Sequence, residues 1–350
     1  HSDFERNFKL TNNQIKGISG GLIYQLLHKS TGFALTAEST SPQFKGHQII
    51  GIRGTKFSSI ADWLTNGNVT VTQGQKNLEV HSGFQKAFAS MKPAFEQYIT
   101  HTKPKCLHVV GHSLGGAIAE LTANWASELG FNTNLYTFGS PRVLITTSAP
   151  HANTTLNHYR VTHSADPVPN VPLWPFGHTV GEYLVAKGGS MHHRAHSMDA
   201  PTPGYINTVS PYKDYRSMEH TIQPIHYRFT TLQYEDRHLV SFSKHWEKII
   251  TDGLLTYLKK AGLYGLMSVQ AVAMSGLSFY DILARSLYQS TIKSVELAEE
   301  LRGLLGHMLV FVGKGAQAVK EMSEKFIRWV FGLMIKALYT AAKYAIDLVS

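Results

Sequence analysis

Residues 109–126 read VVGHSLGGAIAELTANWA. An apolar run ends at Val110, a Gly-His-Ser-Leu-Gly turn follows, and small residues at helical spacing come next. A serine between two glycines at such a boundary is typical of a sharp strand-to-helix turn that exposes the serine hydroxyl at the edge of a sheet. The pattern therefore predicts Ser113 as a nucleophile above a helix N-terminus. The free N–H groups there favour a developing oxyanion, and the backbone N–H of Leu114 is the first expected donor.

Short apolar runs alternate with helical patterns through the first 245 residues. Four runs rich in apolar and β-branched residues, each bounded by Gly, Pro or Ser, are predicted as strands: 47–54, 105–112, 134–141 and 158–163. Helical patterns at 82–100 and 116–129 lie between them. This alternation predicts an α/β fold with a sheet covered on both faces.

From residue 246 onward the pattern is that of long helices without proline. We expect two domains, 1–245 and an appended helical region at 246–350. Five glycines are expected to break the helices: Gly262, Gly303, Gly306, Gly313 and Gly315. Residues 261–280 carry no charge and are long enough to span a bilayer, but their glycines, serines and glutamine favour a buried helix of a small bundle.

The chain has 33 Lys and Arg against 24 Asp and Glu, a net charge of +9. The basic residues are scattered, which favours solubility over nucleic-acid binding, and no nucleic-acid partner is expected. The one cysteine, Cys106, excludes an internal disulfide and is expected to be a buried strand residue. The first residues, HSDFERNF, lack the apolar core of a signal peptide, so none is expected there.

Four ordered stretches resemble the fungal-type, class 3 lipases and their bacterial relatives, across about residues 15–210. In addition to the turn at Ser113, these stretches are IIGIRGTKFSSIADWLTN (49–66), VHSGFQKAF (80–88), LYTFGSPRV (135–143) and YRVTHSADPVPNVPLWPFGHTVGEYL (159–184). The resemblance implies an α/β-hydrolase fold with a Ser-His-Asp triad and no cofactor. It makes Ser113 the nucleophile and Asp166, which follows a strand and precedes Pro167, the acid that orients the histidine.

The same resemblance assigns an oxyanion donor and a lid. Thr55, after Arg53-Gly54, takes the place of the second oxyanion donor. Residues 56–66 take the place of a short lid. An apolar inner face on such a lid would hide the site in water and open on lipid, and the residues expected on that face are Phe57, Ile60, Trp63 and Leu64.

The general base is open between two histidines that follow Asp166. His196 opens a segment with Met198, Tyr205, Ile206 and Val209, which resembles the bacterial members, whereas His220, 54 residues after Asp166, resembles the fungal spacing. We expect His196, with His220 as runner-up. A metal site at His192, His193 and His196 is not expected, because the spacing is not that of a zinc motif and the chemistry needs no metal.

The expected function is hydrolysis of lipid carboxylic esters, triacylglycerol or glycerophospholipid, through an acyl-enzyme. The amphipathic stretch 325–349 is predicted either to pack on the lipase core or on other helices of the tail, or to seat the enzyme on a membrane. A lipase core with an appended helical region also resembles the type VI secretion lipase effectors of bacteria. That resemblance implies secretion by a specialised system, action on membranes and an immunity partner protein. The alternative is an inactive lipase-like module that binds a membrane or protein through its helical tail.

Overall fold

Parallel strands form the centre of the structure, a computed structural model that describes residues 2–11, 15–17, 32–53, 71–74, 78–146, 156–199, 204–264, 279–319 and 322–349. Within these ranges the main sheet has nine strands, in the order β1-β3-β4-β7-β8-β10-β12-β13 with β2 beside β3. The strands are β1 (Phe8–Leu10), β2 (Ile15–Gly17), β3 (Gly32–Ser39), β4 (His47–Arg53), β7 (Cys106–His112), β8 (Thr133–Phe138), β10 (Asn157–His163), β12 (Glu182–Ala186) and β13 (Ile222–Gln223).

The run from β4 to β12 is parallel, and the outer pairs are antiparallel. A smaller antiparallel sheet has the order β11-β9-β6-β5. Its strands are β5 (Val71–Gln73), β6 (Glu79–His81), β9 (Leu144–Ile145) and β11 (Phe176–Gly177). The carboxyl ends of the parallel strands meet at one edge of the main sheet, where ligand and catalytic sites of open α/β sheets lie.

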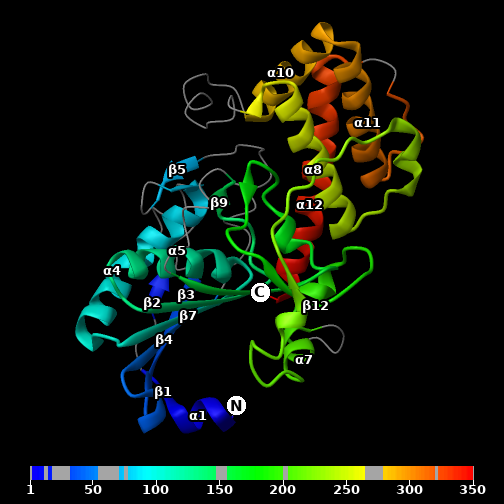
Figure 1. Ribbon diagram of the computed structural model, residues 1–350. Coiled ribbons are helices and arrows are strands. Elements are labelled where there is room, and N and C mark those ends of the chain that lie inside the picture. The colour runs from blue at the N-terminus through cyan, green and yellow to red at the C-terminus, as the bar shows by residue number, and fades with distance from the viewer. Residues whose placement is uncertain are drawn as a thin grey trace.

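Helices cover the two faces of the main sheet unequally (Figure 1). Helices α4 (Ser82–Thr102) and α5 (Leu114–Glu128) pack together on one face, where buried Leu135 points. Side chains alternate along a strand, so Phe138 points to the other face, beside α7 (Tyr205–Val209) and the buried residues Tyr205 and Met218.

Longer helices follow Ser243, whose side chain caps the first of them by accepting from Trp246 N. They are α8 (Lys244–Lys260), α10 (Phe279–Lys293), α11 (Val295–Phe311) and α12 (Glu324–Val349); α1 (Ser2–Asn7) lies near the N-terminus. The 3₁₀ turns are η1 (Pro42–Phe44), η4 (Val168–Asn170), η5 (His193–His196), η6 (Glu219–Thr221) and η7 (Tyr234–Leu239). The predictions of an α/β sheet and of a helical C-terminal region are confirmed.

Two of the predicted helix breaks are wrong. Gly303 and Gly306 lie inside α11, where η7 crosses the helix closely. A Cβ on Gly303 would lie 1.8 Å from the carbonyl oxygen of Leu232, and one on Gly306 would lie 2.7 Å from the ring of Tyr234. These glycines therefore permit a close approach. The positive φ angles after α8 and α11 belong to Gly262 and Gly313.

The long C-terminal helix contacts the loops of the sheet as well as its helical neighbours. Helix α12 packs against α10 and α11, and also against η4 and η5. Val330 of its apolar stripe is buried, whereas Trp329 is 39% exposed. Buried apolar residues on both sides of residue 245 form one cluster, and the domain boundary at 245 stays a prediction.

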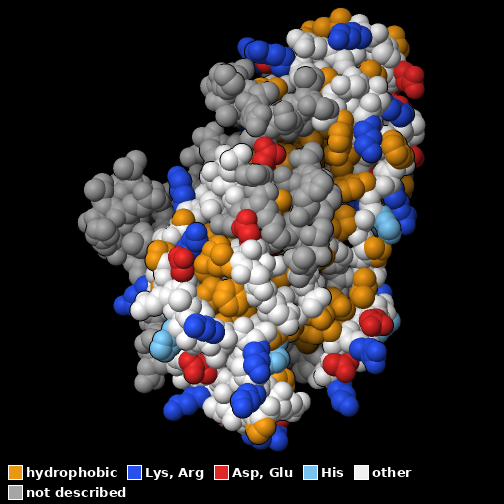
Figure 2. All heavy atoms as spheres, turned by 60° about the vertical axis from the view of Figure 1, so that its left-hand side comes forward, with side chains coloured by type: hydrophobic (Ala, Val, Ile, Leu, Met, Phe, Trp, Pro, Cys, Tyr) orange, Lys and Arg blue, Asp and Glu red, His pale blue; other side chains and the backbone are white. Residues whose placement is uncertain are grey.

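No helix among the described residues is both long and apolar enough to cross a bilayer. Most of the uncharged stretch 261–280 lies outside the described residues, as do the predicted lid and Thr55. On the face shown in Figure 2, Lys and Arg side chains are interspersed with Asp and Glu, in keeping with the scatter of charge along the sequence.

Candidate active site

Ser113 occupies the turn between β7 and α5. Its backbone has φ +57° and ψ −134°, a conformation that L-residues rarely adopt, and its side chain is almost fully buried. Backbone strain of this kind persists only where the surroundings fix it, and it is characteristic of functional positions. Leu114 is the first residue of α5, so its N–H has no partner within the helix and is free to face a ligand.

Two glycines make this turn possible. A Cβ on Gly111 would lie 2.3 Å from the carbonyl oxygen of Gly115, and one on Gly116 would lie 2.6 Å from the Cβ of Ser140. Both distances are below any real carbon contact. The strand, the helix and the β8 loop approach each other closely here because these positions carry no side chain.

A continuous chain of hydrogen bonds runs from Ser113 to Asp166 through His196. His196 Nε2 lies 2.7 Å from Ser113 Oγ, and His196 Nδ1 lies 2.8 Å from Asp166 Oδ2. Because the carboxylate only accepts, Nδ1 carries the proton, and Nε2 is left to accept from the serine hydroxyl. The His196 and Asp166 side chains are both fully buried.

Asp166 is held as an anion by three donors. His196 Nδ1–H and the Tyr205 hydroxyl, at 2.7 Å, both donate to Oδ2, and the Val168 N–H donates to Oδ1 at 2.9 Å. Burial on its own raises the pKa of this carboxyl. Electrostatic attraction to His196 and the three hydrogen bonds outweigh it, so the pKa of Asp166 lies below its ordinary value of 3.8.

Two further histidines hold the backbone of η5, which carries His196. His163 Nδ1–H donates to Ala195 O and His112 Nε2–H donates to His196 O, each at 2.8 Å. The His112 ring stacks on the His196 ring with centroids 4.7 Å apart. Burial, with a smaller contribution from His196, lowers the pKa of His112 to about 3, so it stays neutral at physiological pH and does not repel a protonated His196.

The other candidate base, His220, lies elsewhere. It belongs to η6, is exposed, and packs on the ring of Tyr212. His192 and His193 are exposed, while His196 is committed to Ser113 and Asp166. The structure therefore brings Ser113, His196, Asp166 and Leu114 together; Thr55, Phe57, Ile60, Trp63 and Leu64 lie outside the described residues.

Two residues of the site were not predicted from the sequence. In the sequence Tyr205 is only part of a motif that follows His196, yet in the structure its hydroxyl donates to Asp166. Gly139, in the quoted stretch LYTFGSPRV, has φ +56°, and a Cβ there would lie 2.7 Å from Asp166 Oδ2 and 3.0 Å from the His196 ring. Gly139 thus leaves room for the Asp–His pair.

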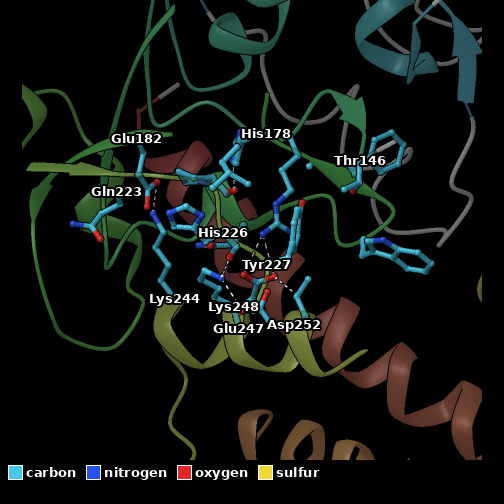
Figure 3. Close-up of a pocket in the computed structure, with 18 of the residues that line it drawn as sticks. Thr146, His178, Glu182, Gln223, His226, Tyr227, Lys244, Glu247, Lys248 and Asp252 are labelled. Carbon is cyan, nitrogen blue, oxygen red and sulfur yellow. Dashed lines mark hydrogen bonds and ion pairs between the residues drawn. The ribbon is translucent and has the colours of Figure 1, made fainter. Parts of the chain in front are cut away.

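A separate cavity of about 120 Å³ lies between η4 and α8 (Figure 3). Lys244, Glu247, Lys248 and Asp252 rise into it from α8, and Glu182 and His178 face them from the sheet side. Its ion pairs are Arg142–Glu247, Arg160–Glu182, Lys244–Glu182 and Lys248–Asp252. Cations and carboxylates neutralise one another there, and the Arg142–Glu247 and Lys244–Glu182 pairs attach α8 to the sheet.

Residues 49–176 match the family model of class 3 lipases. The matched segment contains Ser113 and Asp166 but ends before His196.

Among curated relatives, the secreted mono- and diacylglycerol lipase 1 of Fusarium solani is 37% identical over 153 residues, 40% of this chain and 44% of the relative. The secreted mono- and diacylglycerol lipase A of Penicillium cyclopium is 42% identical over 82 residues, 23% of this chain and 27% of the relative. The chain therefore spans less than half the length of these relatives. A solved structure of Rhizomucor miehei triacylglyceride lipase is 25% identical in sequence. The match includes 53% of this chain and 70% of the Rhizomucor chain, with a TM-score of 0.40.

Proposed function

We propose that the protein is a serine hydrolase that cleaves carboxylic esters of lipids through a covalent acyl-enzyme. The observation that carries the proposal is the hydrogen-bonded chain from Ser113 through His196 to Asp166 at a strained turn. The match of residues 49–176 to class 3 lipases supports the same reaction and argues for lipid esters. The complete triad argues against the alternative of an inactive binding module.

Acylation follows from the hydrogen bonds of the site. Ser113 Oγ attacks the ester carbonyl while His196 Nε2 takes its proton, and Asp166 stabilises the imidazolium that forms. The tetrahedral oxyanion lies at the N-terminus of α5, where the Leu114 N–H donates to it. Thr55 is our proposed second donor, from the sequence resemblance. One such donor contributes about 2.7–4 kcal/mol to transition-state stability.

The remaining steps use the same groups in reverse. His196 gives its proton to the leaving alcohol, which departs and leaves the acyl group on Ser113. A water molecule then attacks the acyl carbonyl, with His196 again taking the proton, and the fatty acid is released. The residue assignments are our proposal, and they need no metal or cofactor.

The proposed substrates are glycerolipids, either triacylglycerol or glycerophospholipid. We propose that residues 56–66 form a lid that controls their access to Ser113. The named relatives are mono- and diacylglycerol lipases, which supports an acylglycerol. Secretion by a bacterial type VI system and an immunity partner stay predictions from the sequence resemblance. Mass spectrometry of the lipids left after incubation with mixed triglycerides and phospholipids identifies the substrate.

Substitution of the triad tests the proposed reaction. With a p-nitrophenyl ester and detergent, we expect Ser113→Ala and His196→Ala each to lower kcat by about 10⁶-fold and Asp166→Ala by about 10⁴-fold, the sizes usual for such triads. His220→Ala is the matched control and keeps full activity. Loss of activity in His220→Ala with retention in His196→Ala would contradict the assignment, and an inactive wild-type protein would favour the binding module.

A further inference from the structure

Three side chains that commonly bind transition metals converge at the start of β4 and β7. His47 and Cys106 are paired neighbours on the two strands, and His108 is two residues beyond Cys106. Because side chains alternate along a strand, Cys106 and His108 share one face of the sheet. Within the described part of the chain, these three form the one group of His, Cys, Asp or Glu whose ligand atoms all lie within 4.8 Å of one another.

We propose that His47, Cys106 and His108 form a binding site for a thiophilic divalent cation of the Zn²⁺ class. With Zn–N of 2.0–2.1 Å and Zn–S of 2.3 Å, a tetrahedral ion sets ligand atoms about 3.4 Å apart for N···N and about 3.6 Å apart for N···S. His47 Nδ1 and His108 Nε2 are 2.9 Å apart, and Cys106 Sγ is 3.6 Å from His108 Nε2. An increase of about 0.5 Å in the distance between His47 Nδ1 and His108 Nε2 makes room for the ion.

The donor set selects the class of metal. One thiolate and two imidazoles suit Zn²⁺ and related late transition metals, whereas Ca²⁺ and Mg²⁺ require oxygen ligands. Cys106 is buried, and both histidines are half-buried. Three protein ligands leave the fourth position for a water molecule on the half-exposed side.

Two neighbouring residues form hydrogen bonds to the proposed ligands, as residues behind the ligands commonly do in metal sites. The Tyr136 hydroxyl lies 3.1 Å from His108 Nδ1, so Nδ1–H donates to it when Nε2 binds the ion. The Asn134 amide donates to Cys106 Sγ at 3.1 Å, which stabilises a thiolate. Both partners come from β8, the next strand of the sheet.

The site lies far from the proposed ester chemistry. Cys106 is the first residue of β7 and Ser113 follows its last, a separation of about 20 Å along the strand. The ion therefore joins β4 to β7 at the end of the sheet opposite the triad, and metal-loaded and metal-free protein are expected to hydrolyse a soluble ester at the same rate.

Cobalt titration of the untagged full chain tests the site, because Co²⁺ bound to a thiolate absorbs in the near ultraviolet. We expect one Co²⁺ per chain with that absorption, displaced by Zn²⁺. Cys106→Ser removes the absorption and weakens Zn²⁺ binding at least 100-fold, and Tyr136→Phe weakens it about 10–100-fold. His101→Gln, an exposed histidine on α4, is the control and changes neither.

His47→Gln provides a second loss of a ligand at a half-exposed position, should Cys106→Ser fail to fold. We expect Zn²⁺ to raise the melting temperature of the wild-type protein but not that of His47→Gln. Equal stoichiometry and affinity in the wild-type protein and in the ligand variants, or no thiolate absorption with Co²⁺, would overturn the proposal. The readouts are spectroscopic and thermal, so they do not depend on ester hydrolysis.

Discussion

Three donors fix the Asp166 carboxylate, and the Tyr205 hydroxyl is the one side-chain donor among them that takes no part in the proposed proton transfers. A hydrogen bond to a charged group contributes about 1.5–3 kcal/mol. We expect Tyr205→Phe to lower kcat about 10- to 100-fold with little change in KM. Steady-state kinetics on a soluble ester measure this. Tyr212→Phe, a nearby tyrosine without a bond to Asp166, serves as control, and an equal loss in both variants would contradict a positioning role for Tyr205.

At this scale the sequence predicts what local patterns encode. The turn around Ser113 and the strand-end position of Asp166 are contiguous motifs, and the structure brings these two residues together. The sequence alone does not decide between His196 and His220 as the base. The partner of a nucleophile is set by proximity in the fold, and Ser113 and His196 are 83 residues apart in the chain. Tyr205 and Gly139 were missed for the same reason, since neither has a local signature of contact with Asp166.

At the scale of elements, the close approach of β7 and α5 depends on Gly111. We expect Gly111→Ala to lower the free energy of unfolding by about 2 kcal/mol or more, because its Cβ would meet rigid backbone at 2.3 Å. Urea denaturation measures the change. Gly51→Ala, on neighbouring β4, meets its nearest atom at an ordinary 3.9 Å and is the matched control. Equal stability of the two variants would show that the turn relaxes freely.

The attachment of α8 to the sheet depends on a buried ion pair. Arg142 Nη2 donates to both carboxylate oxygens of Glu247 at 3.1 Å, and the Glu247 side chain is 2% exposed. We expect Glu247→Gln to cost about 3–5 kcal/mol of unfolding free energy, because the Arg142 charge is left buried without its partner. Thermal and urea unfolding check this value. Glu299→Gln, which removes an exposed pair with Arg302 on α11, is expected to cost less than about 1 kcal/mol.

Two strand boundaries follow closely from runs of apolar and β-branched residues bounded by Gly, Pro or Ser. The strands predicted at 47–54 and 105–112 are observed at His47–Arg53 and Cys106–His112. Gly303 and Gly306 were misjudged because a glycine that permits a crossing looks the same in sequence as one that ends a helix. The contact of η7 with α11 that explains them joins segments about 70 residues apart, which no local pattern reveals.

At the scale of the whole molecule, the helical region and the proposed site form one packed unit. Helix α12 contacts η4, which follows Asp166, and η5, which carries His196. The Tyr280 hydroxyl of α10 donates to Trp174 O, beyond η4. The sequence predicted the helices but left open whether the apolar face of α12 packs on the protein or on a membrane, because a helix pattern shows that an apolar face exists and not what covers it. Helices after residue 243 thus help to hold the loops of the triad.

Buried neutral histidines across the fold make stability fall in acid. His81 is 2% exposed and its Nδ1 accepts from Gly83 N at the start of α4. Burial lowers its pKa from 6.5 to about 4. Between these two values the unfolded chain binds the extra proton, so stability is full above pH 6.5 and is lost as pH falls toward 4, by about 3 kcal/mol from this residue. Burial lowers the pKa of His112 and of His158 to about 3, in the same direction.

Urea denaturation at several pH values between 7.5 and 5 measures this loss. His81→Asn keeps a side-chain acceptor for Gly83 N but has no titrating group, so it should reduce the slope of stability against pH by up to about 1.4 kcal/mol per unit. His101→Gln, at an exposed position of α4, is the control for replacing a histidine. An unchanged slope in His81→Asn would contradict this prediction. It would mean that His81 becomes hydrated and protonated in the folded protein, and that α4 then begins without this cap.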